Sequence, residues 1–96
     1  MKYISISHFD RSFDRYSKPE QETINNTLKA IISYLETGEA THGLRIKKLS
    51  SKIYEARISI KLRIAYFREK DVVKFFCLGT HNDIARCLKR LKSIKI

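Results

Sequence analysis

The sequence is poor in the residues that interrupt regular structure. It has three glycines and one proline in 96 residues, of which 43% are hydrophobic. This composition excludes a disordered tail, a collagen and a flexible linker, and it indicates an ordered globular domain. A chain of 96 residues is also too short for a TIM barrel or a two-half Rossmann fold, so we predict a single domain covering residues 1–96.

Long apolar segments are missing as well. No stretch approaches the roughly 18 consecutive apolar residues that span a bilayer, and residues 1–5 lack the apolar run of a signal peptide. We therefore expect a cytoplasmic protein without a membrane partner. In a reducing compartment its two cysteines, Cys77 and Cys87, are expected to remain thiols.

Acidic residues are scarce relative to basic ones. Asp and Glu number 10 against 20 Lys and Arg, which gives a net charge of +10 at pH 7. Residues 49–96 hold twelve of the basic residues and four of the acidic ones, so most of the excess lies in the C-terminal half. Such a domain usually faces something anionic, above all nucleic acid or an acidic protein. A solvated, highly soluble surface is the alternative.

The N-terminal third predicts one strand and two helices. Residues 2–7 alternate between polar and apolar side chains, as in a short strand. Aromatic residues then recur at helical spacing in residues 8–16. Pro19 suits the first turn of a second helix, whose apolar stripe continues until Gly38, a natural C-terminal stop.

From Leu44 onward the period changes to two, which predicts strands. The expected segments are a short basic stretch at 44–49 and strands at 53–59, 62–68 and 72–78. The last strand is almost continuously apolar, as in a central strand that is buried on both faces. Asn82 or Asp83 can then cap a C-terminal helix.

The predicted order is therefore β-α-α-β-β-β-α, which belongs to the α+β class. We expect an antiparallel sheet with a helical hairpin on one face and a C-terminal helix. Four segments carry a further resemblance, namely 8–13, 43–49, 53–66 and 78–84. In this order and spacing they resemble the opening helix, the pre-strand loop, the central hairpin and the final turn of the RelE/ParE superfamily of bacterial toxins.

The resemblance covers nearly the whole chain and implies a RelE-like fold, an antitoxin partner and one of two activities. RelE-type members cut mRNA, commonly in the ribosomal A site. ParE-type members share the fold but poison DNA gyrase and leave RNA intact. Fold alone does not decide between these activities.

RNA cleavage of this kind requires no metal and no other cofactor. A base removes the proton of the substrate's 2′-hydroxyl, the oxygen attacks the neighbouring phosphorus, and an acid protonates the leaving 5′-oxygen. Fixed cations must stabilise the charge that develops on the phosphate.

Two arginines are candidates for the phosphate clamp. Arg63 follows the hairpin turn, where the resemblance places a family catalytic arginine, and a guanidinium binds phosphate bidentately. Arg57 lies on the preceding strand, where RelE-type members often carry lysine or arginine. A turn centred on Ile60 makes Arg57 and Arg63 face each other, whereas a two-residue turn points them to opposite faces. An ordinary solvated or ion-paired strand arginine is the alternative for each.

His81 and Glu55 are the candidate proton-transfer residues. His81 follows the final strand, where the family often has arginine or histidine, and imidazole titrates near neutral pH. The alternative is a turn histidine that bonds the local backbone beside Asp83. Glu55 stands where the family often has a basic residue, so it is either a general base or the ion-pair partner of Arg57 or Arg63.

Further basic residues are predicted to bind RNA through its phosphates, without reading its sequence. They are Lys47, Lys48 and Lys52 before the hairpin, and Arg86, Lys89 and Arg90 on the last helix. A solvated charge run is the alternative for the lysines, and contact with an acidic antitoxin is the alternative for the helix.

Two other constellations are weaker. Cys77, His81 and Cys87 match no common zinc module, and we predict no metal site. The tyrosines could stack on bases, but their periodic positions favour packing. They are Tyr3, Tyr16, Tyr34, Tyr54 and Tyr66.

The leading hypothesis is a toxin that acts as a ribosome-dependent mRNA endoribonuclease and inhibits translation. Many RelE-type toxins carry a tyrosine in the last helix, whereas Ala85 and Cys87 occupy those positions here. This departure favours the first alternative, a ParE-like gyrase inhibitor. The second alternative is a catalytically degenerate member that binds only antitoxin and operator.

Overall fold

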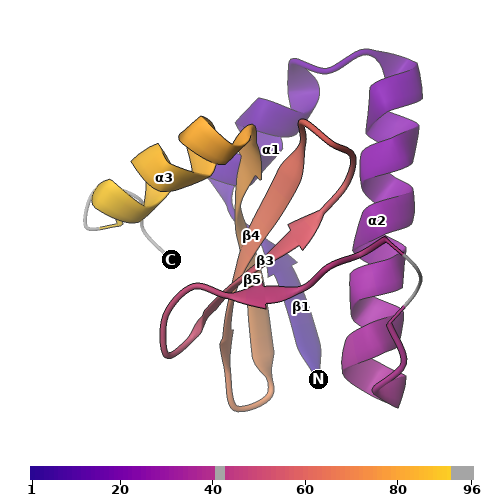
Figure 1. Ribbon diagram of the computed structural model, residues 1–96, viewed down its shortest axis with the longest axis vertical. Helices are drawn as coiled ribbons and strands as arrows, with labels where there is room; N and C mark the ends of the chain where they lie inside the picture. The colour runs from indigo at the N-terminus through magenta and orange to yellow at the C-terminus, as the bar shows by residue number, and fades with distance from the viewer. Residues whose placement is uncertain (41–42, 92–96) are drawn as a thin grey trace.

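Within residues 1–40 and 43–91, which the computed structural model describes, five strands form one sheet flanked by three helices (Figure 1). In chain order the elements are β1 (Lys2–Ser5), α1 (Ser7–Asp14), α2 (Lys18–Thr37), β2 (Lys47–Lys48), β3 (Ile53–Arg57), β4 (Arg63–Glu69), β5 (Val72–Gly79) and α3 (His81–Lys89). The predicted order is confirmed. The basic stretch before the hairpin adds the two-residue strand β2.

The sheet has the strand order β1-β5-β4-β3-β2, and the α+β class is confirmed. β2, β3, β4 and β5 pair antiparallel, as the meander predicts. β1 is an exception to the fully antiparallel sheet that we expected, because it runs parallel to β5 at the sheet edge. The chain leaves β1 through both helices before it enters the meander, so β1 and β5 are not joined by a tight turn and can run in the same direction.

Helix α2 begins and ends where its sequence predicts. Ser17 accepts a hydrogen bond from the Glu20 backbone, and the Glu20 side chain accepts one from the Ser17 backbone, which together form a capping box. Pro19 lies in the first turn. Gly38 closes the helix with a φ of 80°, a conformation that glycine adopts without strain.

The sheet has an apolar layer on each face. Helices α1 and α2 cover one layer, which includes Phe9, Ile31 and Phe75. Helix α3 covers the other, which includes Phe76 and Ile84. Strand β5 contributes to both layers, and this explains why its sequence is almost continuously apolar.

Candidate active site

The four predicted catalytic residues line one pocket of about 390 Å³. Glu55 and Arg57 come from β3, Arg63 from β4, and His81 from the first position of α3. Arg45, Ile46 and Lys47 complete the lining. Segments that are far apart in the sequence therefore bring three arginines, a lysine, a carboxylate and an imidazole to one hollow.

The register of the β3–β4 hairpin explains why the two central arginines meet. Arg57 is the direct cross-strand partner of Arg63, so both side chains lie on the same face of the sheet. The turn is centred on Ile60, whose side chain is exposed. The symmetric alternative left open by the sequence is therefore the one that forms.

His81 reaches the pocket through the pairing of β4 with β5. Arg63 lies opposite Gly79, and α3 begins two residues after Gly79. The first residue of the helix therefore lies beside the arginine pair. His81 itself is exposed, which leaves its imidazole accessible to a bound molecule.

Glu55 is the buried partner of Arg63. Its residue exposure is 7%, and its Oε1 lies 3.8 Å from Arg63 Nε. A buried carboxylate needs a counter-charge, and the guanidinium supplies one. Of the two roles predicted for Glu55, the ion pair with Arg63 is present, whereas its role as a general base stays a prediction.

The arginine pair retains unused hydrogen-bond donors. Within the described residues, Arg57 Nε and Arg63 Nε are buried and have no hydrogen-bond partner. An unpaired buried donor is unfavourable, and most such groups in proteins are satisfied. Two adjacent guanidinium groups with unpaired N–H donors can donate hydrogen bonds to an oxyanion such as a phosphate.

Arg45 is a pocket residue that the sequence did not single out. It lies in the loop before β2, and its φ of 43° is unfavourable for a residue with a side chain. Such strain costs on the order of 1–3 kcal/mol and often occurs at functional sites. Because Arg45 is not in an extended conformation, no alternation pattern in the sequence could have placed it in the pocket.

The other predicted RNA-binding residues are dispersed. Lys47 lines the pocket, whereas Lys48 and Lys52 do not, and Lys52 forms an ion pair with Glu69. Arg86 and Lys89 lie exposed on α3, and Arg90, the residue that caps the end of this helix, is exposed as well. Of these three, Arg86 and Arg90 line a second pocket, which is described below, and Lys89 lines neither.

The cap of α3 differs from the prediction. Thr80 is the N-cap, and neither Asn82 nor Asp83 takes that position. Asp83 instead accepts a hydrogen bond from the Thr80 backbone at 2.8 Å, while its own backbone N–H donates to the Thr80 hydroxyl. Sequence preference ranks Asn and Asp above Thr, but Thr80 with Asp83 satisfies two orphan N–H groups at once. The bond from the Thr80 backbone lowers the pKa of the Asp83 carboxyl.

We expect Gly79→Ala to lower the free energy of unfolding by about 1–3 kcal/mol. A Cβ atom at this position would lie 2.6 Å from the Asp83 Cβ and 2.5 Å from its Oδ2, so the capping box would have to shift. Denaturant unfolding measures the change. Thr80→Ser is the matched control, because it keeps the capping hydroxyl. Equal stability of Gly79→Ala and the wild type would show that the cap tolerates displacement.

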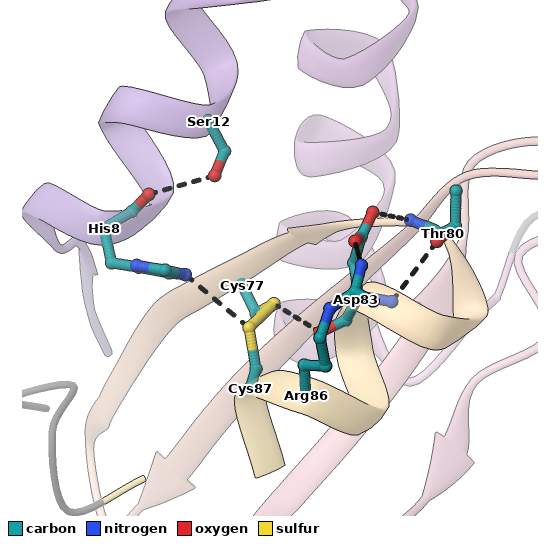
Figure 2. The surroundings of a disulfide bond; sticks show 7 residues. All are labelled: His8, Ser12, Cys77, Thr80, Asp83, Arg86 and Cys87. Atoms are coloured by element: carbon teal, nitrogen blue, oxygen red, sulfur yellow. Dashed lines mark hydrogen bonds and ion pairs between the residues drawn. A yellow bond between two sulfur atoms is a disulfide. The ribbon is translucent and has the colours of Figure 1, made fainter. Parts of the chain in front are cut away.

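Cys77 and Cys87 form a disulfide, so the expectation of free thiols is wrong for this structure (Figure 2). Helix α3 packs on β5, which brings their Cα atoms to 6.4 Å, within the range that a disulfide bridges. The expectation rested on the redox compartment and did not consider this approach. His8 Nε2 lies 3.6 Å from Cys87 Sγ, so the histidine beside the cysteines is His8, whereas His81 lines the other pocket.

The disulfide borders a second pocket, of about 440 Å³. This pocket lies where α1 and α3 meet over β5, and its lining is rich in positive charge. It is lined by His8, Ser12, Arg15, Tyr16, Cys77, Leu78, Asp83, Arg86, Cys87 and Arg90. Arg86 forms an ion pair with Asp83.

Reduction of the disulfide is expected to lower the free energy of unfolding by about 2–3 kcal/mol, because the bond closes a short loop in the unfolded chain. The sequence separation of the two cysteines is 10 residues. Urea unfolding with and without a dithiol reductant, in buffer that contains a chelator, measures the effect. Cys87→Ser should be insensitive to the reductant. Wild-type protein that unfolds identically in both buffers would contradict the expectation.

The tyrosines contribute mainly to the packing of the core, as their periodic positions indicate. Tyr66 is 1% exposed, and its ring stacks on Tyr54 with 5.5 Å between the ring centroids. Burial raises the pKa of Tyr66 to about 12, so its hydroxyl stays protonated at neutral pH. In the described part of the chain, no tyrosine lines the pocket of Arg57 and Arg63.

Comparison with known proteins gives matches in structure alone. No family model and no curated protein matches the sequence. YafQ from E. coli superposes with a TM-score of 0.65 at 15% identity and covers 86% of this chain and 96% of its own. The YoeB/ParE toxin from Agrobacterium tumefaciens gives 0.64 at 18% identity, with 84% of this chain and 99% of its own covered.

A third solved structure is the archaeal RelE–RelB complex from Pyrococcus horikoshii. It gives a TM-score of 0.62 at 14% identity and covers 82% of this chain and 92% of its own. This chain has a RelE-like fold. The RelE-like architecture expected from the sequence is therefore confirmed. No helix among the described residues has the length and apolar character needed to cross a membrane.

Proposed function

We propose that this chain is the toxin of a type II toxin–antitoxin system and that it inhibits translation as an mRNA endoribonuclease. One observation carries the proposal. Arg57 and Arg63 lie side by side in a pocket with His81, and the Nε atoms of both arginines are buried and have no hydrogen-bond partner among residues 1–40 and 43–91. Such a pocket is suited to a phosphate flanked by a group that exchanges protons.

In the proposed reaction the scissile phosphate accepts hydrogen bonds from Arg57 and Arg63. The substrate's 2′-oxygen attacks the phosphorus, and the bond to the 5′-oxygen breaks. The two guanidinium groups stabilise the charge that develops on the phosphate oxygens. Arg45 and Lys47 extend the positive lining toward neighbouring phosphates.

Proton transfer is assigned to His81 as the leading candidate. It is exposed at the start of α3, and an imidazole both accepts and donates protons near neutral pH. Glu55 is buried and engaged with Arg63, so its first role is to position that guanidinium. General-base action by Glu55 is the second possibility, and it requires the ion pair to loosen when RNA binds.

The proposal includes a cognate antitoxin, a cytoplasmic location, and the ribosome with its mRNA as target. The archaeal RelE–RelB structure is a complex of two proteins, which supports a protein partner for this fold. The basic surface of α3 and its C-cap, where Arg86, Lys89 and Arg90 are exposed, offers an acidic partner a complementary face.

A gyrase inhibitor of the ParE kind is the second candidate function. The observation in its favour is the last helix, where Ala85 is exposed and Cys87 is held in the disulfide, so neither position presents a catalytic side chain. In that case the same basic pocket serves only for binding. A member that binds antitoxin and operator alone would have neither activity.

Primer extension on cellular mRNA after brief induction tests the proposal. We expect new 5′ ends inside reading frames within minutes, before growth stops. Growth arrest with intact mRNA and impaired supercoiling would transfer the assignment to gyrase. Folded protein that causes no arrest would indicate the degenerate member.

A further inference from the structure

Three side chains that the proposed function does not use meet beside the second pocket. Figure 2 shows Cys77 from β5, Cys87 from α3 and His8 from α1 converging on one point. The two Sγ atoms and one ring nitrogen of His8 all lie within 4.8 Å of one another. His8 is far from both cysteines in the sequence, and Cys77 and Cys87 lie on a strand and on the helix that packs against it. Only the folded chain therefore brings the three side chains together.

This set of donor atoms is one that zinc prefers. Two thiolates and an imidazole bind zinc tetrahedrally, and three protein ligands leave a fourth position open. In such a site the two sulfur atoms stand about 3.8 Å apart, as a Zn–S bond of about 2.3 Å requires. The Cα atoms of Cys77 and Cys87 are 6.4 Å apart, so rotation of the side chains alone can separate the sulfurs by this amount.

We propose that the reduced protein binds one zinc ion through Cys77 Sγ, Cys87 Sγ and His8 Nε2, and that the disulfide is the metal-free, oxidised form of the same site. A dithiol reductant breaks the S–S bond, and its own two thiols become a disulfide while Cys77 and Cys87 each gain one proton and one electron. Zinc then displaces both thiol protons. No residue of the proposed catalytic pocket takes part, so the inference does not depend on the proposed function.

The surroundings allow a metal ion to enter and be held. The cysteines are almost fully buried, and His8 is half-buried, but all three border the pocket of about 440 Å³. Arg15 and Arg90 line the same pocket, together with the ion pair of Arg86 and Asp83, and positive charge beside a sulfur favours its thiolate form. Two thiolates neutralise the charge of Zn²⁺, so the bound site adds no net positive charge beside these arginines. The fourth position opens into the pocket, where water can occupy it.

Metal titration of the full chain tests the proposal. Protein reduced with a phosphine and freed of metal is titrated with Zn²⁺ against a chromophoric chelator, and with Co²⁺ to record its absorption spectrum. We expect one ion per chain, a tetrahedral cobalt spectrum with thiolate charge-transfer bands, and an increase in the melting temperature of the reduced protein on adding zinc.

Two variants and one oxidation state provide the controls. His8→Gln should weaken zinc binding at least about tenfold, since even groups that only support a ligand contribute that much. His81→Gln removes a histidine outside the cluster and should bind zinc like the wild type. The oxidised protein has the same sequence and fold but no thiolate, so it should bind no cobalt in a tetrahedral site.

Several results would overturn the proposal. Zinc bound equally by the oxidised protein, or equally weakened in both histidine variants, would place the ion elsewhere. A reduced protein with native circular dichroism that takes up no zinc would show that the cluster is only a disulfide with a neighbouring histidine. If reduction unfolds the chain, zinc must restore the native spectrum in His81→Gln and fail to do so in His8→Gln, and any other outcome contradicts the site.

Discussion

Arg63→Ala is expected to slow mRNA cleavage by about 10²–10³-fold, the loss typical of removing one donor from a preorganised anion site. Arg63 lies opposite Arg57, and its Nε has no hydrogen-bond partner among the described residues. In the proposed mechanism, its removal takes away a charged donor to the phosphate on which charge develops. Cleavage of a defined mRNA in a translating extract measures the rate.

The same substitution also affects stability, and the experiment must separate the two effects. Glu55 is 7% exposed and loses its counter-charge in Arg63→Ala. A buried carboxylate without a partner destabilises the fold. The double variant Glu55→Gln/Arg63→Ala removes that charge, so we expect it to recover stability without recovering cleavage.

Two further variants sharpen the interpretation of Arg63. Arg63→Lys keeps the charge but loses the bidentate geometry, so it should retain only part of the activity. Arg68→Ala is the matched control, because Arg68 lies on the same strand and lines neither of the two pockets described above. If a folded Arg63→Ala protein cleaves mRNA at the wild-type rate, Arg63 has no role in the reaction.

His81→Ala is expected to slow cleavage by about 10²–10⁴-fold, the usual contribution of a general acid or base. The side chain is exposed at the first position of α3, so its loss should leave the melting temperature nearly unchanged. The pH–rate profile is the decisive measurement. One limb of the wild-type profile should disappear in the variant if the imidazole exchanges the proton.

Lys89→Ala is the control for His81, since it removes a positive charge from the same helix away from both pockets. It should lower activity slightly and keep the shape of the profile. If the pH–rate profile of His81→Ala keeps both limbs, another group exchanges the proton, and Glu55 is the first candidate to test. In that case Glu55→Gln should remove one of the two limbs that the His81→Ala profile keeps.

Much of the fold was predictable because its signals are local. Capping by Ser17 and Glu20, the proline in the first turn and the stop at Gly38 define α2 without reference to other elements. The continuous apolar character of β5 follows from helices on both faces of the sheet. By contrast, the parallel direction of β1 depends on where the chain returns after two helices, and no local pattern records that.

The candidate site was partly predictable for a similar reason. Residue types on the hairpin could be read from the sequence, but the facing of Arg57 and Arg63 depended on a turn that sequence left open. Arg45 was missed because its place in the pocket follows from an unfavourable backbone conformation in a loop. The role of Thr80 was missed because Asn82 and Asp83 have stronger intrinsic capping preferences.

By itself, the sequence determined the elements, the α+β class and the excess of positive charge, which follow from periodicity and composition within short segments. The candidate catalytic residues came from its resemblance to the RelE/ParE superfamily. Only the tertiary structure decided which charges meet, that Glu55 pairs with Arg63, and that Cys77 lies beside Cys87 and His8. The physical reason is that such contacts depend on strand register and on the docking of helices across the sheet, which many residues set jointly.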